Sequence, residues 1–348
     1  MRFSKRLRAA LAGNALPEEE TPLFTGGALK KLILPLIIEQ TLTITVGMAD
    51  TVMVSSLGDA AMSGVSLVDN INTLIINIFA AFATGGAVVA AQFLGAQKEK
   101  NARETAGQVI VSTLLISLAV MGVCLWQGEP IIRLLFGEIE PAVMESASVY
   151  FRISAYSYPF IGVYSCCAAL FRAMGNSKVS MYSGLLANVV NIGFNALFIY
   201  GMDMGPAGAA WGSFLSRFSS MLLLILLLTD RRNAVYISLR EKFVFNGRVL
   251  RKIFRIGLPN SLENGVFQLG RIMVLRIITL FGVVQIAANG VANNLSALGC
   301  IPGQAMNLAM ITVVGQCVGA GSRVQARHYT RRLMAVTYLF TVAVNTLI

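Results

Sequence analysis

The chain has 348 residues, of which 55% are hydrophobic and only 13% are charged, and its mean hydropathy is +0.68. Soluble domains carry about 25% charged residues, and a single soluble core stops growing near about 250–300 residues. The composition therefore excludes an ordinary soluble protein and indicates a multi-spanning membrane protein.

Nine hydrophobic segments are long enough to be membrane helices, because a span needs roughly 20 mostly apolar residues. A basic and then acidic stretch without an apolar core precedes them, which is typical of a cytoplasmic tail rather than a signal peptide. The predicted segments are 32–57, 66–94, 106–126, 148–171, 180–200, 206–229, 255–281, 286–318 and 333–348. We therefore expect an all-α integral membrane protein, a polytopic helical bundle.

Lysines and arginines are concentrated in alternate loops, and this asymmetry predicts the orientation. The tail and every second loop hold 23 of them, whereas the intervening loops hold only Arg133. Because these residues favour the cytoplasmic side, the N-terminus is predicted to be cytoplasmic, in a cell (plasma or inner) membrane. The net charge of +11 then reflects topology and attraction to membrane lipid, and no nucleic-acid partner is expected.

The sequence contains an internal repeat. A shift of 224 residues aligns 34–103 with 258–327 without a gap and superposes Gln92 and Gly95 on Gln316 and Gly319. Parallel repeats of this kind are related by an axis along the membrane normal. The repeat divides the chain into a tail (1–29), a six-helix N-lobe (30–229), a basic cytoplasmic linker (230–253) and a partial C-lobe with about three helices (254–348). We expect a complete second lobe to need about three more helices, on the order of 100 residues.

Polar residues inside apolar segments are functional candidates, because a charge at the bilayer centre costs about 2.5–3.5 kcal/mol. Glu39 and Asp50 are eleven residues apart and so lie on nearly the same face of a helix. This spacing favours a protein-lined cavity, with helix packing or a structural ion pair as the alternatives. Asn188, Asn191 and Asn195 share one face of the fifth segment, where amides bind a cation or a carboxyl group, or join helices.

A second group of polar residues is predicted to line a substrate cavity. Asp69 lies nearer the outer end of its segment, so simple solvation is its alternative. Glu263 and Arg271 are expected to pair with one another, or with Glu39 or Asp69, whereas Arg217 is expected to snorkel to an interface. The candidate cavity residues are Glu39, Gln40, Asp69, Glu263, Asn264, Gln268, Arg271 and Asn293.

The residue types that support enzymatic and metal chemistry are scarce. The chain has one histidine and five cysteines, and the cysteines lie in apolar segments without a CxxC pair or metal-ligand spacing. The sequence has no HExxH or GxSxG pattern. We therefore expect a protein that is not an enzyme and that has no metal site and no cofactor.

Four stretches, in their order and spacing, resemble the multidrug and toxic compound extrusion (MATE) transporters. They are Ala49–Val54, Ala90–Ala96, Leu170–Lys178 and Gly205–Ser213. The resemblance implies two six-helix lobes around a cavity and export of drugs or organic cations in exchange for H⁺ or Na⁺ by alternating access. It also implies that Asp50 is the coupling acid and that Asn191 and Asn195 face it. Asn188 shares their helix face and is predicted to belong to the same coupling site.

The resemblance further implies a small, cationic amphiphilic substrate and a monomeric transporter whose only bound ion is the coupling H⁺ or Na⁺. The alternative is a flippase of the same superfamily that moves a lipid or a lipid-linked oligosaccharide. Arg271 and Arg276 favour that alternative, because a pyrophosphate group would need a more cationic cavity.

Overall fold

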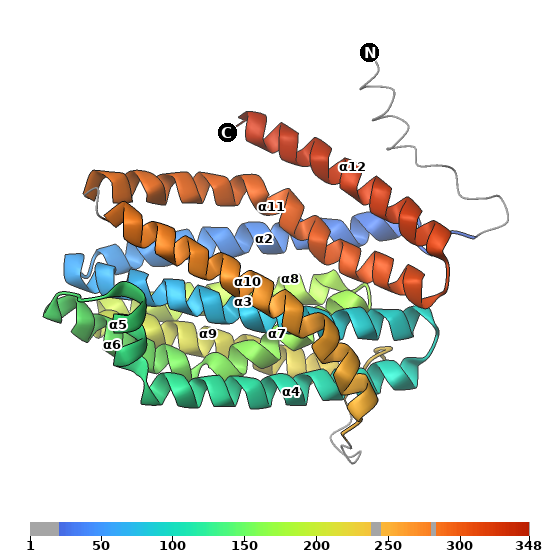
Figure 1. The fold of residues 1–348 in the computed structure, drawn as a ribbon, viewed down its shortest axis with the longest axis horizontal. Helices are drawn as coiled ribbons and strands as arrows, with labels where there is room; N and C mark the ends of the chain where they lie inside the picture. Colours follow the sequence, from blue (N-terminus) through green and yellow to red (C-terminus); the bar gives the residue numbers. More distant parts are fainter. Residues whose placement is uncertain (1–20, 238–244, 280–282, 348) are drawn as a thin grey trace.

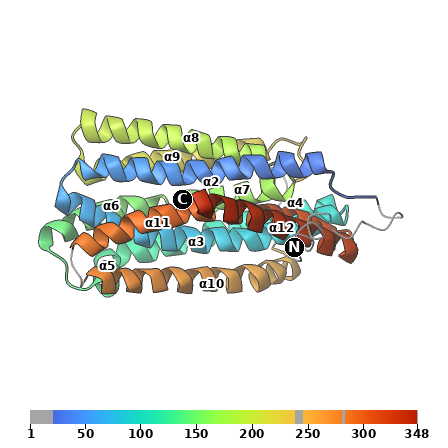
Figure 2. The same ribbon diagram turned by 90° about the horizontal axis from the view of Figure 1, so that it is seen from above.

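The computed structural model of the protein describes residues 21–237, 245–279 and 283–347. This part of the chain is an elongated bundle of helices and contains no strand (Figure 1). The expected all-α fold class is confirmed. Figure 2 shows α8 and α9 on one side of the bundle and α10 on the other, with α3 between them.

The helices follow the predicted segments closely, and each of the nine segments overlaps at least one helix. The short helix α5 was not predicted, because its nine residues are too few to span a membrane. Ile132 is its buried residue. The helices are α2 (Gly26–Ser55), α3 (Asp59–Gly95), α4 (Glu99–Trp126), α5 (Gly128–Phe136), α6 (Pro141–Tyr156), α7 (Tyr158–Ala173), α8 (Ser177–Ala196), its π-helical extension η1 (Leu197–Gly201), α9 (Gly205–Leu228), α10 (Gly247–Thr279), α11 (Val283–Gly319) and α12 (Arg323–Leu347).

The fourth predicted segment is two helices rather than one. α6 and α7 meet at Ser157 with a bend of 49°. Pro159 lies in the first turn of α7 and has no amide hydrogen to continue the helix from α6. The Ser157 hydroxyl donates to the Ser154 carbonyl at 2.6 Å and so satisfies one of the last acceptors of α6.

Six helices in the described residues are long and apolar enough to cross a membrane, or seven if the bent pair counts as one span. They are α2, α3, α4, α8 with η1, α9 and the 295–319 part of α11. α10 and α12 are less apolar. α10 carries Glu263, Arg271 and Arg276, and the first ten residues of α12 include four arginines. Their polar residues are therefore expected to face other helices or an aqueous cavity.

The connections 96–98, 174–176 and 320–322 lie at one end of the bundle, which we call the basic end. The connections 56–58 and 202–204 lie at the opposite end. α3 is the central helix and packs against α4, α6, α7, α10 and α11. Two glycines allow α3 and α10 to approach closely: a Cβ atom on Gly85 would lie 2.6 Å from the Cα atom of Gly257.

Near the basic end, α3 and α11 cross in a reciprocal contact. Gly95 lies against the backbone carbonyl of Gln316, and Gly319 lies against the backbone carbonyl of Gln92. These are the positions that the 224-residue repeat superposes. A contact in which residue i meets j while their counterparts meet in the same way is typical of a two-fold axis. The crossing agrees with the parallel repeat, which stays a prediction.

Adding a methyl group at this crossing is expected to destabilise the protein. In Gly95→Ala or Gly319→Ala the new Cβ would overlap a carbonyl oxygen of the other helix. Overpacking of this kind costs about 1–3 kcal/mol, so thermal unfolding in detergent should begin at a lower temperature. Gly303→Ala is the control, because Gly303 lies in α11 with open space around it. Equal unfolding temperatures for all three variants would contradict the close crossing.

Candidate functional site

Asp50, near the opposite end of α2, is held by a chain of side-chain amides. Asn195 on α8 donates from Nδ2 to Asp50 Oδ1 at 2.8 Å and to Asn191 Oδ1 at 3.3 Å. Asn191 in turn donates to the Ser213 hydroxyl of α9 at 3.2 Å. Asn188, the third amide, donates to the backbone carbonyl of Leu42 at 3.3 Å. The structure thus directs all three asparagines to neighbouring helices and joins two of them to Asp50.

The amide of Asn195 is only partly satisfied. Its side chain is 1% exposed, and Oδ1 has no hydrogen-bond partner among the described residues. This oxygen lies against Gly212 of α9, at the place where any larger residue would put its Cβ atom. A buried carbonyl oxygen without a donor is rare. Next to a carboxylate, it offers a free acceptor to a proton-bearing group or a cation.

Asp50 and Asp69 line one cavity of about 210 Å³ between α2 and α3. Asp69 accepts a hydrogen bond from the Tyr150 hydroxyl of α6 at 2.9 Å and a long one from Asn72 at 3.4 Å. Asn72 also accepts from the Tyr158 hydroxyl at 2.9 Å. Asp69 is an exposed residue that lines the cavity, whereas its hydrogen-bond donors Tyr150 and Asn72 are buried.

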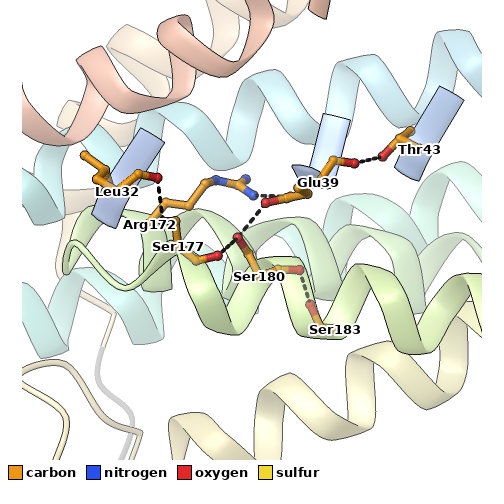
Figure 3. Close-up of polar contacts among 7 residues, drawn as sticks. All are labelled: Leu32, Glu39, Thr43, Arg172, Ser177, Ser180 and Ser183. Carbon is orange, nitrogen blue, oxygen red and sulfur yellow. Dashed lines mark hydrogen bonds and ion pairs between the residues drawn. The ribbon is translucent and has the colours of Figure 1, made fainter. Parts of the chain in front are cut away.

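Glu39 belongs to a separate cluster nearer the basic end of α2 (Figure 3). Arg172, in the last turn of α7, forms an ion pair with Glu39 Oε1 at 3.0 Å. Ser180 of α8 donates to Glu39 Oε2 at 2.7 Å, and Ser177 donates to the Leu32 carbonyl at 2.6 Å. Glu39 is 8% exposed. The structure shows the ion pair that the sequence left as an alternative, and a role for Glu39 in the substrate cavity stays a prediction.

The remaining predicted residues lie mainly on α10. Asn264 donates to the Asn260 carbonyl at 2.8 Å, and Gln268 is buried. Glu263 is exposed and forms no ion pair within the part of the chain that the structure describes. Its expected pairing with Arg271 is not seen, because about eight residues of helix separate the two by more than two turns. Gln40 is half-buried on α2.

Arg271 instead lies beside Asn293 of α11. Its Nη2 atom donates to Asn293 Oδ1 at 3.4 Å. Both residues line a second cavity of about 440 Å³, whose walls include Val266, Phe267 and Asn70. Asn70 also lines the cavity of Asp50 and Asp69. One residue of α3 therefore adjoins both cavities.

Comparison with known proteins identifies the family. The family model MatE matches residues 35–197 and 257–348. The chain belongs to the MatE family. MatE proteins are multi-pass membrane transporters, in agreement with the apolar helices of this chain.

Relatives of this MatE chain include transporters from several bacteria. The probable multidrug resistance protein NorM of Thermotoga maritima is 28% identical over 98% of this chain and 74% of its own length. The uncharacterized transporter YisQ of Bacillus subtilis is 26% identical over 84% of this chain. The chain spans only 64% of the length of YisQ.

Solved structures show the same fold. An outward-facing multidrug resistance MATE transporter of the MOP superfamily matches with a TM-score of 0.80 and 23% identity. The match covers 91% of this chain and 68% of that one. A MATE crystal structure in the bent conformation matches with a TM-score of 0.82 and 24% identity, over 91% and 70% of the two chains.

Two residues near the site have partners that the sequence did not predict. Arg217 is expected to snorkel to an interface, but in the structure its Nη1 atom donates to the buried Ser157 hydroxyl at 2.6 Å. Tyr150 of α6 donates its hydroxyl hydrogen to Asp69, a role that the hydrophobic pattern does not predict. A tyrosine in an apolar helix needs a partner for its hydroxyl, and this need was the available signal.

Proposed function

We propose that the chain is the coupling part of a secondary active antiporter that exports small cationic amphiphiles in exchange for H⁺ or Na⁺. The observation that carries the proposal is the Asp50 carboxylate, bound by the buried Asn195 and open to a cavity that it shares with Asp69. Two carboxylates on one cavity attract a cationic substrate. The names of relatives such as NorM and the multidrug export protein MepA of Staphylococcus aureus support export of drugs.

The coupling step follows from the chemistry of Asp50 and Asn195. A proton or Na⁺ on Asp50 removes the charge that holds a cationic substrate in the cavity. The free Oδ1 atom of Asn195 then accepts a hydrogen bond from the protonated carboxyl group, or binds Na⁺ together with the carboxylate. An ion drives transport only if it binds the two conformations with different affinity, so the helices around Asp50 must move when it is neutralised.

The orientation of the bundle gives this step a direction. The basic end is cytoplasmic by the distribution of lysine and arginine, so we place the chain in the cell membrane with a cytoplasmic N-terminus. With this orientation the close crossing of α3 and α11 lies on the cytoplasmic side, and Asp50 lies towards the outside. We propose that this arrangement is an outward-open state and that a single copy works as a monomer without a further cofactor.

Flux measurements in everted membrane vesicles test the proposal. A proton gradient (acid inside) and a sodium gradient are imposed separately, and uptake of the fluorescent cation rhodamine 123 is followed. We expect uptake under one gradient and its collapse when an ionophore dissipates that gradient. The absence of uptake under both gradients, with the protein demonstrably inserted, would refute antiport of cations. It would favour the flippase alternative, for which Arg271 is the specific observation.

A methyl group at Gly212 is expected to slow coupled transport. In Gly212→Ala the new Cβ would overlap Asn195 Oδ1 and force the amide away from Asp50. Loss of one hydrogen bond to a charged group costs about 1.5–3 kcal/mol, so gradient-driven uptake should fall about tenfold. Gly193→Ala on α8 is the matched control, because Gly193 has open space around it. Normal uptake by Gly212→Ala would show that this contact does not serve coupling.

A further inference from the structure

Arg271 is an exposed residue that lines a largely apolar cavity, and it has no counter-ion among the described residues. Among the described residues it forms no ion pair, and its hydrogen bond to Asn293 is long, at 3.4 Å. The other walls of its cavity include Val266, Phe267 and Val274. A guanidinium group has five N–H donors, and only Nη2 has a hydrogen-bond partner among the described residues.

Within the given sequence, the stretch that follows Glu263 offers no acid to neutralise Arg271. Residues 264–348 contain no aspartate or glutamate. Glu263, on the same helix, lies more than two turns away and is exposed. An arginine in a membrane-spanning protein is costly unless it pairs or faces a watery cavity that serves transport. The position of Arg271 therefore calls for an anion that the described residues do not supply.

The neighbouring cavity has the opposite charge. Asp50 and Asp69 line it from the N-lobe, and Asn70, adjacent to Asp69, lines both cavities. A substrate that passes Asn70 thus meets carboxylates on one side and a guanidinium group on the other. The apolar walls and the aromatic ring of Phe267 suit a flat hydrophobic body between the two charges.

We propose that Arg271 recognises an anionic group, such as a carboxylate, on an amphiphile whose cationic group binds at Asp50 and Asp69. The preferred substrate is then a dipolar molecule rather than a simple organic cation. This inference rests on the proposed export function and adds to it a specificity residue on the C-lobe. Asn293 orients the guanidinium group through its hydrogen bond to Nη2.

A matched pair of dyes tests the inference. Rhodamine 110 carries a free carboxylate, and rhodamine 123 is its methyl ester, so the two differ only in that negative charge. Binding of each dye to the purified full chain is measured by fluorescence anisotropy for the wild type, Arg271→Gln and Arg271→Lys. We expect Arg271→Gln to weaken rhodamine 110 binding about tenfold, because one charge-assisted contact is lost, and to change rhodamine 123 binding less than about twofold. The lysine variant should restore part of the affinity.

Arg255→Gln is the control, because Arg255 lies on the same helix, is exposed, and lies outside this cavity. Equal losses for both dyes, or unchanged binding of rhodamine 110, would overturn the role of Arg271 while leaving cation export intact. Failure of both dyes to bind the wild type would instead overturn the proposed function. Farnesyl pyrophosphate is the third probe: tighter binding than either dye, lost in Arg271→Gln, would replace the dipolar amphiphile by an anionic lipid.

Discussion

Replacing Asp50 by asparagine is expected to abolish gradient-driven dye uptake while the protein remains folded. Asparagine has nearly the same shape, and its amide oxygen still accepts the hydrogen bond from Asn195 that Asp50 accepts at 2.8 Å. It cannot take up a proton, and it binds Na⁺ without neutralising a charge. The cation then has no differential affinity for the two conformations, and the gradient has no means of driving transport.

We therefore expect uptake of rhodamine 123 by Asp50→Asn to fall to the level of empty vesicles under either gradient. Binding of the dye should persist in part, since Asp69 remains in the cavity. Asp59→Asn is the matched control, because Asp59 is an exposed acid in the first turn of α3. Gradient-driven uptake by Asp50→Asn at the wild-type rate would contradict the coupling role. A loss of both binding and folding would assign Asp50 to structure.

Local pattern was sufficient to predict the helices and one face of the site. Stretches without charged residues gave the segments, and the spacing of Asn188, Asn191 and Asn195 gave a shared face. Only the family resemblance predicted that Asn191 and Asn195 lie near Asp50, because Asp50 and Asn195 are 145 residues apart in sequence. Periodicity fixes the face of a helix, whereas the partner of that face depends on tertiary packing.

The periodicity of the sequence does not predict ion pairs between distant helices, for the same reason. In the sequence Arg172 lies beside a basic loop. In the structure it lies in the last turn of α7 and forms an ion pair with Glu39, which is 133 residues away in sequence. Both acids of α2 carried the same sequence signal. Asp50 faces a cavity, and Glu39 faces α7 and α8, because an offset of eleven residues leaves them on one face but about 16 Å apart along the helix.

The repeat was the most informative sequence feature for the packing of the two halves. Two of its identical positions, Gly95 and Gly319, lie where α3 and α11 make close backbone contact. The repeat predicted two parallel halves, whereas the crossing of α3 and α11 at Gly95 and Gly319 was visible only in the structure.

The second large effect is expected at the Glu39–Arg172 ion pair. Arg172→Gln leaves the Glu39 carboxylate buried, with Ser180 as its remaining donor. Removing one partner of a buried pair costs about 3–5 kcal/mol, so the thermal unfolding temperature in detergent should drop by several degrees. The loss of stability should extend to α11, which is bonded to the same end of α7. Thr312 and Gln316 of α11 donate to the backbone carbonyls of Arg172 and Ala173, both at 2.8 Å.

A double-mutant cycle separates the pair from its individual side chains. The variant that combines Arg172→Gln with Glu39→Gln has no uncompensated charge, so it should be more stable than the sum of the two single changes predicts. Arg133→Gln is the control, because Arg133 and Glu129 form a short ion pair of 2.7 Å in which both side chains are more than half exposed. Exposed pairs contribute at most about 1 kcal/mol. If Arg172→Gln and Arg133→Gln lowered the unfolding temperature equally, burial would not be what makes the Glu39 cluster stabilising.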